Sequence, residues 1–73
     1  MKTYDKIKFD KPTKFLGRNG MFDCTGLEIF LVEDVIYISP ITSKGETGRA
    51  EIQIPKENVL DVINIINIME GML

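Results

Sequence analysis

The sequence predicts a single α+β domain, an antiparallel sheet of three to five strands with one C-terminal helix packed on one face. Three observations support this prediction. Residues 27–54 alternate apolar and polar side chains with the period of two that is typical of strands. Residues 56–70 repeat apolar side chains at helical spacing, and Pro55 separates the two patterns. A chain of 73 residues also has room for only one core.

Composition places the chain among ordinary globular proteins. Apolar residues make up 44% and charged residues 27%. The single cysteine, Cys24, cannot form an internal disulfide, and a lone cysteine fits a reducing compartment. No apolar segment is long enough for a signal peptide or a membrane span. We therefore expect a cytoplasmic protein that does not enter a membrane.

Charge is distributed unevenly along the chain. Residues 1–18 contain six cations and two anions, whereas residues 19–73 contain three cations and nine anions, and the net charge is −2. A basic arm on an acidic body can contact nucleic acid. It can equally be a solubilising terminus that docks on the acidic half of its own chain.

Residues 1–20 are predicted to be a basic segment with short strands. Ile7 and Phe9 alternate with lysines, which predicts a short edge strand whose charges discourage further pairing. Phe15 and Leu16 predict a second short strand, and Asn19-Gly20 predicts a tight turn after it.

Residues 27–54 are predicted to be the core of the sheet. Two strands meet at Glu33-Asp34, which places Val32 opposite Val35 if these two residues form the turn. Glu-Asp is not a favoured pair for such a turn, so a longer loop with a shifted register is the alternative. With the short turn, the first face of the sheet carries Leu27, Ile29, Leu31, Ile36 and Ile38, and the second carries Glu28, Phe30, Val32, Val35, Tyr37 and Ser39. A third long strand, "RAEIQI", follows with Ala50, Ile52 and Ile54 inward.

The helix is predicted from Lys56 to Glu70, because Pro55 suits a helix start and Gly71 a helix end. One apolar stripe is wide enough to cover a small sheet and is expected to face the core: Val59, Val62, Ile63, Ile66 and Met69. Further apolar residues lie outside this stripe: Leu60, Ile65, Ile68 and Met72. An exposed surface of this kind predicts a homodimer or another protein partner. The alternative is that N-terminal segments cover it.

One helix leaves the second face of the sheet open. Phe30 and Tyr37 on that face could stack bases of single-stranded nucleic acid, or they could form a structural cross-strand cluster. The loop "TSKGETGR" leads into a strand rather than a helix, so it is predicted to be a turn in which Gly45 and Gly48 take positive φ. An anion contact by Lys44 and Arg49 is the second interpretation.

The sequence offers little support for catalysis. It contains no histidine, which is the commonest general base and metal ligand. Cys24 is interpreted as a small buried hydrophobe. We therefore predict no catalytic, cofactor-binding or metal-binding residues and a protein that is not an enzyme.

The stretch "KGETGRAEIQIPKENVLDVINII", residues 44–66, resembles the single-stranded-DNA-binding transcriptional coactivator family of the positive-cofactor type. The resemblance implies a curved four-stranded sheet, dimerisation through the C-terminal helices and binding of unpaired nucleic acid across the sheet. It also implies that Lys44 and Arg49 correspond to the family's basic loop and strand start. That family is basic along its strands, whereas this chain carries acidic residues there that would repel phosphate: Glu28, Glu33, Asp34, Glu46 and Glu51.

Two functional hypotheses follow. The one that the sequence favours is a homodimeric protein-interaction or regulatory domain that uses the outer helix residues. The alternative is single-stranded nucleic-acid binding, in which Phe30 and Tyr37 stack bases and a set of cations contacts phosphates: Lys6, Lys8, Lys11, Lys14, Arg18, Lys44 and Arg49.

Overall fold

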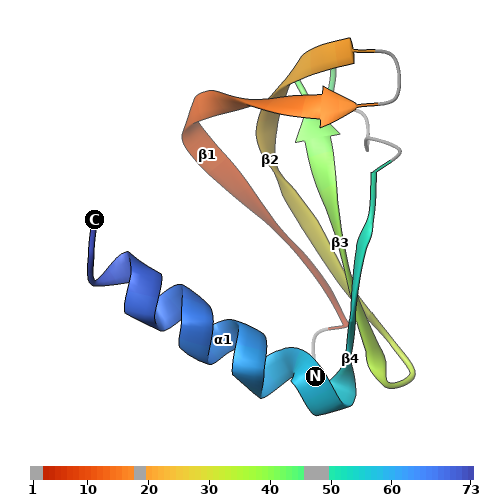
Figure 1. Ribbon diagram of the computed structural model, residues 1–73. Helices are drawn as coiled ribbons and strands as arrows, with labels where there is room; N and C mark the ends of the chain where they lie inside the picture. The colour runs from red at the N-terminus through yellow and green to blue at the C-terminus, as the bar shows by residue number, and fades with distance from the viewer. Residues whose placement is uncertain (1–2, 18–19, 46–49) are drawn as a thin grey trace.

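The structure is a computed structural model that describes residues 3–17, 20–45 and 50–73. Four strands form one antiparallel sheet in the order β1-β2-β3-β4, and α1 follows the last strand (Figure 1). The elements are β1 (Tyr4–Gly17), β2 (Gly20–Val32), β3 (Val35–Thr42), β4 (Ile52–Pro55) and α1 (Lys56–Glu70). The predicted α+β class, the antiparallel sheet and the single C-terminal helix are confirmed.

The β2–β3 hairpin has the two-residue turn rather than the longer loop. Val32 pairs with Val35, and Glu33 takes a positive φ of 54°. This conformation costs energy for a residue with a side chain, which explains why Glu-Asp did not stand out as a turn pair. The resulting register pairs Ile29 with Ile38, so the predicted division of the two sheet faces is confirmed along this hairpin.

The N-terminal segment forms one long strand rather than two short ones. β1 pairs with β2 on both sides of an irregularity between Lys8 and Thr13. Pro12 lies within that irregular stretch of an edge strand, where a missing N–H interrupts no regular ladder. Gly17 pairs with Gly20, and Asn19 of the predicted turn lies outside the described residues.

The best-buried part of the described chain is a bend in β2. The register with β3 shifts between Cys24 and Gly26, and the Thr25 hydroxyl donates to the carbonyl oxygens of Ile41 (3.3 Å) and Thr42 (3.1 Å). Cys24 is 3% exposed, which confirms its interpretation as a small buried residue. Gly26 is also buried, and a Cβ at this position would overlap the carbonyl oxygen of Ile7 in β1.

The last strand is shorter than predicted. Ile52 and Ile54 pair with β3 on the predicted face, whereas Ala50 precedes the strand and Arg49 lies outside the described residues. α1 has the predicted bounds and follows Pro55 without an intervening residue. The N–H of Gly71 donates to the carbonyl oxygen of Asn67 (3.3 Å) and closes the helix.

The helix contacts the sheet only through its first turns. Figure 1 shows α1 extending away from the end of β4 instead of lying along the strands. Of the stripe predicted to face the core, Val59 and Val62 are half-buried, but Ile63, Ile66 and Met69 are exposed. The expectation that the whole stripe is buried within one chain is therefore corrected. The physical reason is the direct strand-to-helix junction, which has no loop to turn the helix back over the sheet.

Candidate interaction surface

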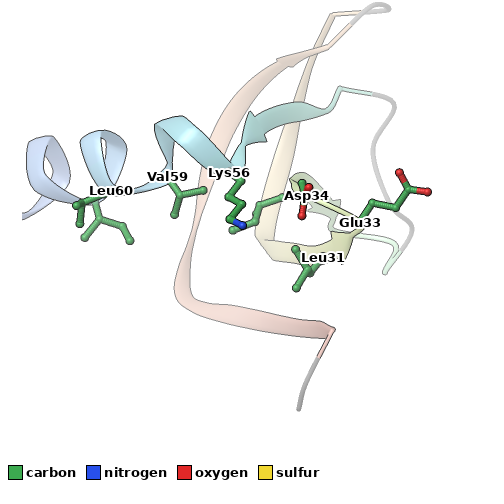
Figure 2. Close-up of a pocket in the computed structure, with 8 residues that line it drawn as sticks. Leu31, Glu33, Asp34, Lys56, Val59 and Leu60 are labelled. Carbon is green, nitrogen blue, oxygen red and sulfur yellow. The ribbon is translucent and has the colours of Figure 1, made fainter.

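The helix and the sheet diverge around a groove of about 630 Å³, which we call the helix–sheet groove. Apolar side chains of β2, β3 and α1 line it together with three charged residues. Figure 2 shows Leu31 on the sheet side and Val59 and Leu60 on the helix side. The lining residues are Leu31, Glu33, Asp34, Ile36, Lys56, Val59, Leu60 and Ile63.

The groove continues onto the first face of the sheet, which we call the apolar sheet face. Pairing of β2, β3 and β4 places aliphatic side chains side by side on this face, and β1 adds Ile7 beside Leu27 and Asp5 beside Ile29. Ile7 on one edge strand is 51% exposed and Ile52 on the other is 59% exposed, so the face is not closed by its own helix. Its aliphatic members are Ile7, Leu27, Ile29, Leu31, Ile36, Ile38, Ile52 and Ile54.

Apolar side chains are exposed along most of the helix. Leu60 near its start is 67% exposed, Ile68 near its end is 64% exposed, and Met72 after it is 79% exposed. The four residues predicted to form an interface are all exposed: Leu60, Ile65, Ile68 and Met72. The described N-terminal residues therefore do not cover them, and the alternative of an internal cover does not apply to this structure.

The accessible area of the chain is large for its mass. It is 6182 Å² for 8.3 kDa, whereas a compact monomer of this mass exposes about 4,600 Å². The Cα radius of gyration is 13.2 Å, compared with roughly 11 Å for a compact domain of this length. The excess of about 1,600 Å² is twice what one partner contributes to a standard-sized interface.

The second face of the sheet carries a row of three rings, which we call the aromatic sheet face. Tyr4, Phe30 and Tyr37 lie in register on β1, β2 and β3. The rings of Tyr4 and Phe30 contact each other, with centroids 4.8 Å apart. In the next rung, Lys6 pairs in register with Glu28, and the Tyr4 hydroxyl donates to a Glu28 carboxylate oxygen (3.3 Å).

The predicted phosphate contacts do not form one basic surface. Lys6 and Lys8 have the register of the aromatic sheet face, whereas Lys14 pairs with Asp23 across β1 and β2, with Nζ 2.5 Å from Oδ1. Lys11 lies in the irregular stretch of β1, and Lys44 is exposed in the turn after β3. Two further predicted contacts lie outside the described residues: Arg18 and Arg49.

The glycine-containing loop behaves as a turn over its described part. Gly45 has φ of +79°, as predicted, and its N–H donates to the Thr42 carbonyl oxygen (2.9 Å). Gly48 lies outside the described residues.

The described residues contain neither a metal-binding cluster nor a membrane-spanning helix. Within ranges 3–17, 20–45 and 50–73, no group of three or more His, Cys, Asp or Glu side chains is placed to hold a metal ion. No helix in the same ranges has the length and apolarity needed to cross a membrane.

Comparison with known proteins identifies no similar protein. No protein-family model matches the chain, and neither a curated protein nor a solved structure matches it significantly. The resemblance to the single-stranded-DNA-binding coactivator family therefore stays a prediction.

Sequence reasoning missed three residues of these surfaces. Tyr4 extends the aromatic row, but its position depends on the β1–β2 register, which the pattern around Pro12 concealed. Leu31 and Ile36 were assigned to the correct face, but their place in an open groove depends on the direction of α1. The periodicity of apolar residues does not indicate the direction in which α1 leaves the sheet.

Proposed function

We propose that this chain is a small non-enzymatic binding module that works as a homodimer and whose interface is formed by α1 and the apolar sheet face. The observation that carries the proposal is the excess of accessible area. Two chains that each covered about 1,600 Å² would share a total of about 3,200 Å², which lies in the range of obligate homodimers.

The distribution of burial supports the same proposal. Among the described residues, the buried side chains are small, and no large side chain falls below 2% exposure. A helix that is apolar on most sides is normally enclosed on more than one side. A second copy supplies enclosing surface of the same composition, since each copy carries both a bare helix and a bare sheet face.

A substitution in the outer part of α1 tests this proposal. Burial of an isoleucine side chain stabilises by about 1.5–3 kcal/mol, so loss of Ile68 from both copies costs the dimer about 3 kcal/mol. Ile68→Asp should therefore weaken dimerisation at least about 100-fold. Sedimentation equilibrium would measure the dissociation constants of the wild type and the variant.

Asn67→Asp is the matched control. It adds the same charge at the neighbouring position of the helix but removes no apolar side chain, and Asn67 is already exposed. We expect Asn67→Asp to remain a dimer. A wild-type chain that sediments as a monomer at all accessible concentrations would refute the proposal.

A second candidate function is single-stranded nucleic-acid binding on the aromatic sheet face. The specific observation in its favour is the row of Tyr4, Phe30 and Tyr37, because stacking on adjacent rings is how sequence-tolerant proteins hold unpaired bases. Lys6 and Lys8 supply nearby positive charge, and the Glu28 carboxylate opposes them.

Fluorescence anisotropy with a labelled single-stranded oligonucleotide tests the second candidate. Binding should appear at about 10 μM protein in low salt and weaken as salt rises. Tyr37→Ala should reduce it, whereas Phe15→Ala, which removes a ring of the separate Phe15–Phe22 pair, should not. No binding by the wild type at low salt would exclude this candidate.

A further inference from the structure

The surfaces left bare in one chain define how two copies fit together. We propose that the chains exchange helices: α1 of each copy docks on the apolar sheet face of the other, in a closed twofold pair. This inference rests on the proposed homodimer and specifies its geometry.

The junction between β4 and α1 is the first support. Pro55 pairs with Val35, the next residue already belongs to the helix, and the N–H of Lys56 donates to the carbonyl oxygen of Asp34 (2.8 Å). The start of α1 is thus fixed to the β2–β3 turn at the end of the sheet. A helix that folds back on its own sheet normally needs a connection of two or more residues. Short connections of this kind favour exchange between copies.

The two sides of α1 are the second support. Val59, Leu60 and Ile63 line the chain's own helix–sheet groove. At about 100° per residue, Ile65, Ile68 and Met72 lie roughly 160° away from them around the helix. The outer side therefore points away from the chain's own groove and is free to meet the partner, while the inner side stays on the groove of its own chain.

The dimensions and chemistry of the two surfaces agree. The 15 residues of α1 extend about 22 Å, and the 8 residues of β3 at the centre of the sheet extend about 26 Å. Ile29, Ile38 and Ile52 form an aliphatic row across three strands beneath that path. A direct helix-to-helix seam would cover the outer side of α1 but would leave this row bare, whereas reciprocal exchange covers both surfaces at once.

Charge complementation between variants tests the exchange. Ile68→Asp damages the helix surface, Ile52→Lys damages the sheet surface, and each variant alone should dimerise at least about 100-fold more weakly than the wild type. In an equimolar mixture, exchange produces a heterodimer with one wild-type contact and one Asp–Lys contact. Native mass spectrometry should detect this heterodimer, and circular dichroism should show structure gained on mixing if the separate variants are partly unfolded.

The matched control is a mixture of Ile68→Asp with Ile68→Lys. A helix-to-helix seam would place these two side chains near each other and would rescue that mixture, whereas exchange leaves both of its contacts damaged. Rescue of the control mixture alone, or of neither mixture, would overturn helix exchange while a dimeric wild type kept the proposed function. A wild type that assembles into open polymers would overturn the closed pair, and a monomeric wild type would overturn both proposals.

Discussion

The proposed homodimer predicts that dilution should destabilise this protein, because folding and assembly would then be one event. Among the described residues, the buried ones are Cys24 and Gly26 in β2 and Ser39 and Pro40 in β3. This is too little apolar burial to offset the conformational entropy of 73 residues. We therefore expect two unfolded chains to be in equilibrium with the folded dimer, without a populated folded monomer.

The size of the effect follows from this stoichiometry. A 100-fold dilution lowers the free energy of unfolding of a dimer by RT ln 100, which is about 2.7 kcal/mol. With a urea dependence of about 2 kcal/mol per molar, the midpoint should move down by roughly 1.4 M. A folded monomer would show no shift at all.

Circular dichroism of α1 provides the assay, since the helix supplies most of the signal near 222 nm. Urea curves would be recorded at two protein concentrations that differ 100-fold. Ile68→Asp at the higher concentration should resemble the wild type at the lower one, and Asn67→Asp should follow the wild type. Wild-type curves that superimpose at both concentrations would refute the coupling of folding to assembly.

Three further predictions concern single positions. Gly26→Ala should lower the free energy of unfolding by about 1–3 kcal/mol in urea titrations, because the added Cβ would overlap the carbonyl oxygen of Ile7 and force β1 away from β2; an unchanged midpoint would contradict the close approach. Glu33→Gly should raise it by about 0.5–1 kcal/mol by relieving the positive φ, whereas the control Asp34→Gly should give no gain. Lys14→Ala should change it by less than about 1 kcal/mol, because the ion pair with Asp23 is exposed to solvent; a loss above about 2 kcal/mol would show that the pair is part of a larger contact.

The sequence predicted the elements whose boundaries are set by local chemistry. Pro55 and Gly71 fixed the bounds of α1, and alternation around Glu33-Asp34 fixed the faces of β2 and β3. The long β1 was not predicted, because Pro12 suggested an end to the strand and only the paired β2 shows that the strand continues. Periodicity reports which side of an element is apolar, but it does not report which surface that side meets.

Periodicity likewise identified the exposed apolar residues of α1 but did not predict which surfaces the charged residues share. Ile65, Ile68 and Met72 exceed the apolar surface that one half-buried helix needs, and they are exposed in the single chain. The N-terminal lysines lie close together in sequence, but β1 continues past its irregularity and Lys14 pairs with Asp23. Nearness along a bent edge strand does not place side chains on a common surface.

The two candidate functions use opposite faces of the sheet and are therefore compatible. The proposed assembly through α1 would cover the apolar sheet face and would leave the row of Tyr4, Phe30 and Tyr37 accessible on each copy. One such row, with few cations beside it, would hold a short oligonucleotide weakly. The proposed dimer carries two rows of rings. An oligonucleotide long enough to reach both rows would bind with higher affinity, because binding to the first row raises its effective concentration at the second. A long oligonucleotide should therefore bind the wild type more tightly than a short one, and Tyr37→Ala should weaken binding and leave the dimer intact.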